Sequence, residues 1–446
     1  MPLRSNTLPT PLPVSRSSSQ NPFKEEAVEM TSSVKSLDGE TQPPSAHDHH
    51  GEVDSYFTGP RDLSHHSRWP TFLRIHGSVL PRMVLPIAFV AAWSTAITAV
   101  AVLVHDIGIN HVLLTVMGFV VGLSLSFRSS TAYERYNDGR KYWAQLNQVT
   151  QNLARLVWIH ADERKEVATE DLLAKVTFCN MLAAFAVALK HRLRFEPFTH
   201  YEDLEPRLRH LPILAKDAVR RDWTDPSPWK IAGLVLGLPM AESNPRKLVK
   251  NPRKPLGNVP LEILASCSAY IKTIIDNGTF KAPSYQTQSM ALIASLHDIL
   301  TGTDRVLNTP LPIAYSIAIS QITWVYILVL PFQLTDYLSW ATIPATVFAA
   351  YIILGISIIG AEIENPFGED VNDLPLDSFC EQIRQDIDLI LSQAPNAAQK
   401  FIENDSNALL YPLSNLGFNA LKGKSTDEIR QMLRSKPEMT FKIAEE

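Results

Sequence analysis

Four long stretches without a charged side chain constrain the fold more than any other feature of the sequence. They are residues 84–104, 107–127, 311–334 and 341–361. A helix needs about 20 apolar residues to cross about 30 Å of hydrocarbon, and each stretch is long enough. One such stretch could be a buried helix of a soluble protein, but four in two close pairs indicate two membrane-spanning hairpins. We therefore predict an all-α fold with multi-pass membrane helices.

Basic residues near the ends of these stretches predict the orientation in the membrane. The two short hairpin loops carry Asp106 and Asp336 but no lysine or arginine. Basic residues lie instead before the first stretch, after the second and before the third: Arg74, Arg82, Arg128, Arg135, Arg140, Lys141 and Arg305. Loops rich in lysine and arginine stay in the cytosol. Both termini and the long central segment are therefore predicted to be cytosolic, at the plasma membrane or an organelle membrane.

The remaining sequence divides into four further segments. Residues 1–68 are rich in serine, proline and histidine and are predicted to be a disordered tail. Residues 128–308 are too long for a loop and are expected to form a helical cytosolic region. Its uncharged run 176–189 is short for a span and is expected in the core of that region. Residues 374–421 are predicted to form C-terminal cytosolic helices, 374–391 and 396–421, and residues 422–446 a polar end.

Composition and motifs argue against several classes of protein. The net charge of −5 is opposite to the basic excess of a nucleic-acid-binding protein. Cys179, Cys267 and Cys380 lie far apart, so they indicate buried thiols and neither a disulfide framework nor a zinc site. The motifs of phosphate-binding loops, zinc proteases and serine hydrolases are missing. We expect a protein that is not an enzyme and requires no cofactor.

The second uncharged stretch carries a row of large apolar residues. Phe119, Leu123 and Phe127 recur every four residues and therefore share one face of a helix. The row could face lipid or the protein core, or it could line a narrow hydrophobic pore that gates by losing its water. The spacing alone favours the first interpretation.

Charged residues of both signs follow the row directly. We expect most of them to form a structural network that holds the helix to its neighbours. They are Arg128, Glu134, Arg135, Asp138 and Arg140.

Acidic and amide side chains crowd a turn after the fourth stretch. They include Glu362, Asn365, Asp370 and Asp373. Hard cations such as calcium prefer such oxygen-rich sites, although the spacing is not that of an EF-hand. A solvated acidic turn ahead of the next helix is an equally good interpretation.

Four sequence motifs resemble those of the bestrophins and bestrophin-like membrane proteins, in particular the microbial branch. They are 127–143 (FRSSTAYERYNDGRKYW), 308–315 (NTPLPIAY), 330–334 (LPFQL) and 364–377 (ENPFGEDVNDLPLD). The resemblance extends from about residue 69 to 391. It implies that residues 69–373 form a channel domain and that copies of the chain assemble as a homo-pentamer around a central pore.

The resemblance also assigns the constrictions of that pore. Phe119, Leu123 and Phe127 fall on three hydrophobic neck positions, which favours the pore interpretation of the row. A lower cytosolic constriction falls near Ser284 and Tyr285, where serine replaces a hydrophobic residue.

A calcium clasp of the animal proteins corresponds to the acidic turn. The resemblance implies that Asp370 and Asp373 would supply carboxylates and that Glu362 and Asn365 would supply backbone oxygens. Val371 interrupts the acidic run, and the tail offers no match for a further ligand of the clasp. Calcium could therefore be bound, but the sequence does not require it.

Taken together, the residues and the resemblance favour an ion channel in the lipid bilayer that passes chloride or other small anions. Arginines near the inner mouth favour anions weakly. One alternative is a cation-permeable member of the same family. Another is a non-conducting membrane scaffold whose cytosolic domain binds partners and whose tail is a phosphorylation-controlled docking site. A secondary transporter is disfavoured because no charge lies within a span and no inverted repeat is visible.

Overall fold

The computed structural model describes residues 77–105, 107–109, 111–196, 198–214, 257–393 and 398–445. The expected tail, residues 1–68, lies outside this part of the chain. All regular secondary structure in the described part is helical, and no strand occurs there. The predicted all-α class is confirmed.

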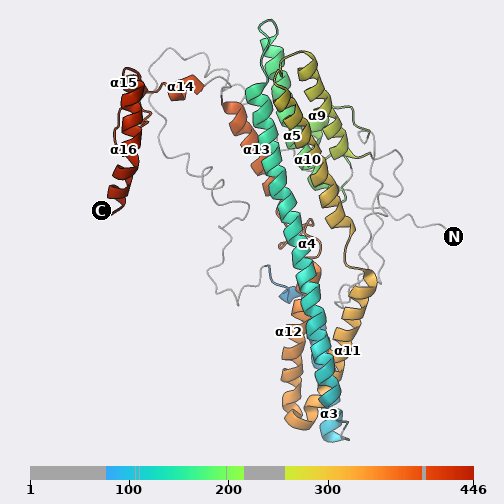
Figure 1. Ribbon diagram of the computed structural model, residues 1–446. Helices are drawn as coiled ribbons and strands as arrows, with labels where there is room; N and C mark the ends of the chain where they lie inside the picture. The colour runs from blue at the N-terminus through green and yellow to red at the C-terminus, as the bar shows by residue number, and fades with distance from the viewer. Residues whose placement is uncertain are drawn as a thin grey trace, which may run out of the picture. The chain divides into compact units, whose positions relative to one another are not determined.

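The four uncharged stretches coincide with four helices. They are α3 (Leu80–Leu103), the first part of α4 (His111–His160), α11 (Ile313–Leu338) and α12 (Thr342–Glu362). Helices α11 and α12 pack against the N-terminal part of α4 (Figure 1), and α3 packs against α11 and α12. Their length and composition suit a membrane-spanning segment. One buried cluster joins three of them: it contains Met83 and Val90 of α3, Ile327 of α11, and Ala350 and Leu354 of α12.

Helix α4 extends far beyond the predicted second span. It contains 50 residues, about 75 Å of helix, and continues without a break from the bundle of α3, α11 and α12 into a second bundle. The first is called the membrane bundle, and the second, which the sequence predicts to be cytosolic, is called the cytosolic bundle. After Phe127 its buried residues recur every three or four positions, as Trp143, Leu146, Val149 and Leu153 show. This spacing keeps an apolar face on the helix, so the helix continues although the sequence becomes rich in charge.

The cytosolic bundle packs on one side of the second part of α4. It contains α5 (Ala168–Leu193), the short α6 (Glu205–Leu208), α9 (Val259–Asp276), α10 (Pro283–Asn308) and α13 (Leu376–Ser392). Its core is one large cluster in which Phe178, Leu182, Phe185 and Leu189 of α5 are fully buried. Contacts join α5 to α9, α13 and α4, so α5 is the central helix of this bundle.

Helix α5 shows why the uncharged run 176–189 does not need a membrane. By length and composition it is a candidate span. However, 67% of its most apolar window is buried inside the protein, against 22% to 28% in the other candidate spans. The neighbouring helices cover its apolar surface, as the sequence predicted for a core helix.

The C-terminal part differs from the expected helices. The predicted helix 396–421 is replaced by two short helices, α14 (Ala398–Ile402) and α15 (Phe418–Lys422). Pro412 lies between them and offers no backbone N–H for a helix. The segment 422–446, expected only as a polar end, contains the 20-residue helix α16 (Thr426–Glu445). The amide of Glu428 donates to Oγ of Ser425, which stabilises the first turn of α16.

The three cysteines are buried and free. Burial raises the pKa of the Cys179, Cys267 and Cys380 thiols to about 12. The thiols therefore stay protonated at neutral pH and behave as small apolar side chains. The prediction of ordinary buried thiols is confirmed.

Candidate functional site

The membrane half of α4 has one covered and one uncovered face. Val121 and Leu125 are buried against Ile319 of α11. Successive helix residues turn by about 100°, so Phe119, Leu123 and Phe127 lie on the opposite side. Their exposed fractions are 72%, 47% and 55%. The structure therefore brings the three predicted neck residues together on a face that the rest of the chain leaves open.

The same face continues toward the start of α4 with two valines that the sequence reasoning missed. Val116 lies three residues before Phe119 and Val112 one turn earlier, and both are more than half exposed. A search that accepted spacings of three as well as four residues would have found them. Next to this row, a side chain added at Gly122 would meet no atom within 4 Å. The flank of the row is therefore open as well.

Arg135 joins four helices at the membrane boundary. Its guanidinium donates from Nε to the Glu364 carbonyl oxygen at 3.0 Å, from Nη2 to the Val306 carbonyl at 2.7 Å, and from Nη1 to the Thr309 carbonyl. Glu364 in turn accepts a hydrogen bond at 3.0 Å from the Leu311 amide. These contacts tie α4 to the end of α10, the start of α11 and the end of α12.

Other members of the predicted charge network have separate contacts. Nη2 of Arg128 lies 3.9 Å from Oε2 of Glu364, and the Arg128 side chain is almost fully buried. The guanidinium of Arg140 lies over the ring of Phe379 in α13, 4.5 Å from its centroid. The arginines that follow the neck are thus structural, as expected, at three positions.

The acidic turn after α12 closes onto the start of α3. Nη1 of Arg82 lies 3.3 Å from Oε2 of Glu362, and Nη2 lies 3.0 Å from Oδ1 of Asp370. The Asn372 amide donates to the Gly77 carbonyl at 3.1 Å and to Oε1 of Glu362 at 2.7 Å. A guanidinium therefore lies between the Asp370 carboxylate, which the resemblance assigns to a calcium clasp, and the carboxylate of Glu362, whose backbone oxygen it assigns to the same clasp.

Asp373, the other carboxylate of the predicted clasp, points into its own turn. Its Oδ2 accepts a hydrogen bond from the Asp370 amide at 2.8 Å. Burial, together with the nearby Asp370 and Glu362 carboxylates, raises the pKa of Asp373 to about 6. Among the described residues no group of three or more His, Cys, Asp and Glu side chains is placed to hold a metal ion. The predicted clasp combines two carboxylates with backbone oxygens, so calcium binding at this turn stays a prediction.

The predicted lower constriction lies at the far end of α4. Ser284 and Tyr285 occupy the first turn of α10, where Ser284 is exposed and Tyr285 is partly buried. The ring of Tyr285 stacks on His160, the last residue of α4, with centroids 4.2 Å apart. Helix α4 thus connects the two predicted constrictions, which are separated by about 50 Å of helix between Phe127 and His160.

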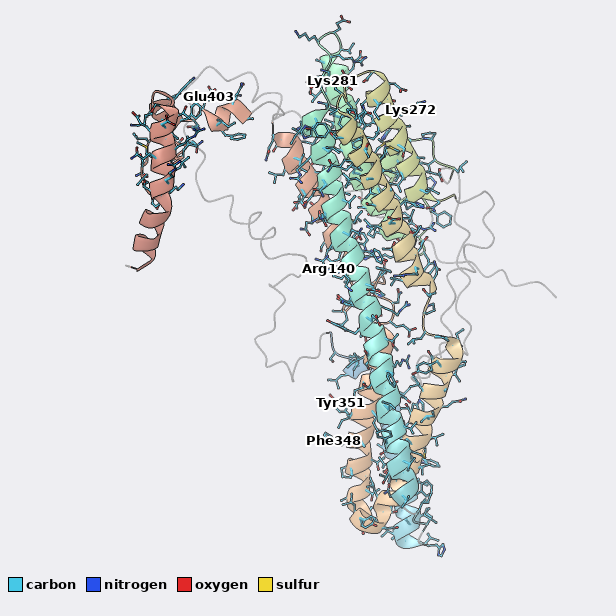
Figure 2. The ribbon with its side chains drawn as sticks, in the orientation of Figure 1. Arg140, Lys272, Lys281, Phe348, Tyr351 and Glu403 are labelled. Atoms are coloured by element: carbon cyan, nitrogen blue, oxygen red, sulfur yellow. The ribbon has the colours of Figure 1, made fainter. Side chains whose placement is uncertain are left out.

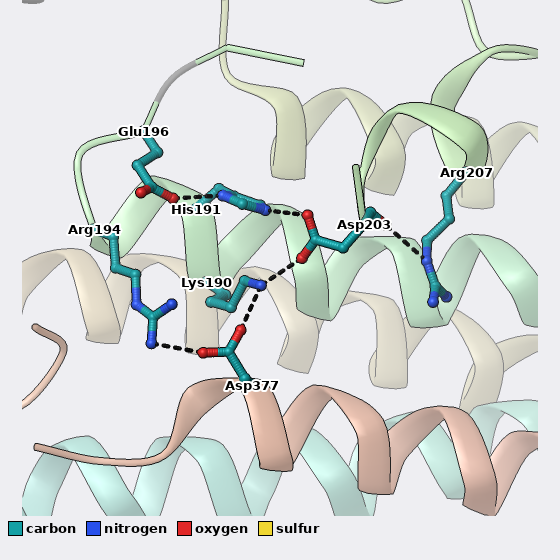
Figure 3. A network of polar contacts seen from close by, with 7 residues as sticks. All are labelled: Lys190, His191, Arg194, Glu196, Asp203, Arg207 and Asp377. Atoms are coloured by element: carbon teal, nitrogen blue, oxygen red, sulfur yellow. Dashed lines mark hydrogen bonds and ion pairs between the residues drawn. The ribbon is translucent and has the colours of Figure 1, made fainter. Parts of the chain in front are cut away.

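A polar network that sequence reasoning missed joins α5 to α13 (Figure 3). The ammonium of Lys190 contacts Asp203 and lies 2.7 Å from Oδ1 of Asp377. The ring of His191 lies 2.8 Å from Asp203, and Arg194 lies 2.9 Å from Asp377. Lys190 and Asp377 are 187 residues apart in the chain, and no local pattern links them.

The charges of this network stabilise one another. Burial alone would raise the pKa of Asp203, but hydrogen bonds from Lys190 and His191 outweigh it and hold this pKa below its usual value. Burial would likewise raise the pKa of Asp377, which contacts with Lys190 and Arg194 keep low. The network is a structural clamp on the cytosolic bundle, since each buried charge has an opposite partner.

Comparisons with known proteins agree with the geometry. Residues 61–388 match the sequence model of the family described as bacterial/fungal bestrophin protein. A voltage-dependent anion channel-forming protein of Synechocystis sp. is 33% identical over 340 residues, which cover 75% of this chain and 96% of that protein. A voltage-dependent anion channel-forming protein of Nostoc sp. is 34% identical over 294 residues, covering 65% of this chain and 81% of that protein.

Solved structures show the same fold. The crystal structure of a variant of a bacterial bestrophin homolog from Klebsiella pneumoniae superposes with a TM-score of 0.52 at 21% identity. The superposition covers 71% of this chain and all of that chain. The sequence match, the fold and the membrane-spanning hairpins lead to one assignment: this membrane protein belongs to the bacterial/fungal bestrophin family.

Proposed function

We propose that this protein is a channel for chloride and other small anions, with a pore on the axis of a homo-pentamer. Two of its relatives are named as anion channel-forming proteins. The observation that carries the proposal is the uncovered row of Phe119, Leu123 and Phe127 on α4. Facing the axis, the row would lie opposite its own copies in the other subunits, across the water of the pore.

The chemistry of this row suits a gate. Apolar side chains offer no ligand to an ion, so an ion crosses only while the constriction holds water. The edges of phenylalanine rings are electropositive and favour anions over cations at close range. Five copies each of Phe119, Leu123 and Phe127 would form three successive rings. The middle ring is aliphatic and smaller than phenylalanine, which leaves the aromatic edges at the two ends of the neck.

The orientation of the chain in the membrane is part of the same proposal. Arg82, Arg128 and Arg135 all lie at the end of the membrane bundle that adjoins the cytosolic one, and the hairpin loops at the other end contain no lysine or arginine. The rule that basic ends stay in the cytosol favours both termini inside. The arginine-bearing end is then the inner mouth of the pore.

The decisive experiment is a reversal-potential measurement on the purified full chain in planar bilayers with a KCl gradient. A reversal potential near the chloride equilibrium value is expected. A value near the potassium equilibrium would make the protein a cation-permeable member of the family. Absence of current together with absence of flux from liposomes would favour the non-conducting scaffold. Native mass spectrometry of the detergent-solubilised protein is expected to give five copies, and a monomer would overturn the shared pore.

A further inference from the structure

The uncovered face of α4 does not end at Phe127. Residues that follow it at spacings of three or four remain on the same side of the helix, because seven residues make almost two full turns. One side chain at these positions, Asn152, is partly buried, and seven others are exposed in the structure: Ser130, Glu134, Asn137, Lys141, Gln148, Arg155 and Ile159. One face of α4 is thus open from Phe119 in the membrane bundle to Ile159 at the far cytosolic end.

The opposite face of the same segment is the packed one. Trp143, Leu146, Leu153 and Val157 are buried in the core of the cytosolic bundle. The chain's other helices therefore lie on one side of α4 and leave the other side free. This arrangement repeats the one in the membrane half, where Val121 and Leu125 are covered and Phe119 is not.

The chemistry of the open face changes at Phe127. Before this residue the face carries valine, phenylalanine and leucine, and beyond it the face carries a hydroxyl, amides and charges until Ile159. An apolar open face calls for contact with other protein or lipid, whereas amide and charged side chains are well solvated. The cytosolic part of the face therefore suits a wall in contact with water.

The positive charges of Arg155 and Lys141 on this face remain available to attract anions from solution. Arg155 donates from Nη2 to the neutral Asn152 side chain at 2.6 Å, which leaves the positive charge uncompensated there. Lys141 lies 3.3 Å from Asp138, but its side chain is 67% exposed, so water screens this pair. Glu134 supplies the one acidic side chain among the seven exposed positions.

The lower constriction that the resemblance places near Ser284 already implies a cytosolic vestibule that continues the pore for about 50 Å below the neck. We propose that Lys141 and Arg155 on the open face of α4 line this vestibule and set its preference for anions. This inference rests on the proposed function, because it requires that Phe119, Leu123 and Phe127 face the axis of the pentamer. In a pentamer each cation would form a ring of five. A narrow space lined by one sign of charge raises the local concentration of the opposite ion.

The test compares the chloride-to-potassium permeability ratio of full-length variants in planar bilayers. Lys141→Glu and Arg155→Glu are each expected to lower the ratio, and the double variant is expected to lower it several-fold. The effect should shrink in about 1 M salt, where charges are screened over about 3 Å. An unchanged ratio in a conducting, pentameric double variant would overturn the role of Lys141 and Arg155, while the anion channel would stand. A wild type that does not conduct would instead overturn the proposed function itself.

A matched control lies next to Lys141 in the sequence. Arg140, labelled in Figure 2, stacks on Phe379 of α13 and so lies off the open face. Arg140→Gln and Lys141→Gln each remove one positive charge from neighbouring positions of one helix. Only Lys141→Gln is expected to lower the ratio. An equal effect of both would show that overall charge acts rather than the open face.

A second measurement covers the case in which the glutamate variants do not assemble. Lys141→Cys introduces an exposed thiol, whereas the native Cys179, Cys267 and Cys380 are buried. A positively charged methanethiosulfonate applied to this variant should restore the anion preference, and a negatively charged one should lower it further. If neither reagent changes the permeability ratio of the Lys141→Cys channel, although labelling is confirmed by mass, position 141 does not face the ion path.

Discussion

Helices α3 and α5 are a natural pair for comparison because they are similar in length and their most apolar windows have the same mean hydropathy. They contain 24 and 26 residues. Neighbouring helices bury 67% of the most apolar window of α5 but only 28% of that of α3. The same kind of sequence is thus covered by protein in one place and left for lipid or other subunits in the other. An apolar helix alone does not identify a membrane span, and the length of its uncharged run separates the two cases.

The polar side chains of the two regions differ in the same way. In the cytosolic bundle, Lys190 and its acidic partners satisfy one another. In the membrane bundle, four buried hydroxyls find no hydrogen-bond partner within the chain: Ser94, Thr98, Thr342 and Thr346. They lie in α3 and α12, where small side chains let two helices approach closely. The cytosolic bundle also contains buried polar atoms without a partner among the described residues, Nε1 of Trp143, Nε of Arg194 and Oγ1 of Thr199, so the two regions differ in the kind of unpaired group. In α3 and α12 these groups are all hydroxyls.

The largest effect is expected from truncating the core of α5. Phe185→Ala removes a fully buried ring and should lower the free energy of unfolding by about 3–5 kcal/mol. Phe119→Ala, its counterpart on the open face of α4, should change this free energy by less than about 1 kcal/mol, because the ring is 72% exposed. Thermal unfolding of both variants in detergent measures the difference. Equal losses would mean that the open face is buried in the assembled protein.

Removing the central cation of the polar network should have the next largest effect. Lys190→Met leaves Asp203 and Asp377 without their shared partner, and the buried position accepts an unbranched apolar side chain. We expect a loss of about 1–3 kcal/mol, moderated because both carboxylates are partly exposed. Lys281→Met, which removes a lysine from an exposed ion pair with Asp162, is the matched control and should be nearly neutral. Equal stability of the two variants would contradict the clamp.

Acid should weaken the same network in a defined direction. The pKa values of Asp203 and Asp377 are lowered in the folded protein, so their contribution is complete above the ordinary aspartate pKa of about 3.9. The contribution is lost as the pH falls from there through the lowered values. The stability gap between wild type and Asp377→Asn should therefore be widest near neutral pH and close in strong acid. A gap that widens in acid would reverse the assigned sign.

The neck should control conductance while contributing little to stability. Changing Phe119, Leu123 and Phe127 together to alanine lowers the dewetting barrier and should raise single-channel conductance or open time several-fold. Planar-bilayer recording measures this effect, and Val84→Ala, at an exposed apolar residue of α3, provides the control. Unchanged conductance in the triple variant would remove the row from the gate.

The smallest effect is expected in the contact between α3 and α12. Thr98→Val replaces a buried hydroxyl that has no partner with a methyl group of similar size. The change should be neutral or slightly stabilising, within about 1 kcal/mol. A loss well above this in thermal unfolding would show that the hydroxyl binds a partner from a second subunit or a buried water.

The sequence alone was sufficient for the features that depend on local composition. The uncharged stretches predicted the four membrane helices, and the row of Phe119, Leu123 and Phe127 was correctly placed on one side of α4. The extension of α4 beyond Phe127 was missed because charged residues obscure its apolar spacing. The contact between Arg82 and Asp370 was also missed, since 288 residues separate the two. Contacts of that kind depend on how the helices pack, and no window of the sequence contains both partners.

The unbroken α4 has a mechanical consequence. A helix without a joint transmits tilt along its whole length, and the three hydrogen bonds of Arg135 hold it firmly at one point. That point lies about 12 Å from Phe127 and about 37 Å from His160 along the helix axis. The helix segment from Arg135 to His160 is therefore about three times as long as the segment from Arg135 to Phe127. A lateral displacement of about 3 Å at the cytosolic tip would therefore move the Phe127 end by about 1 Å in the opposite direction.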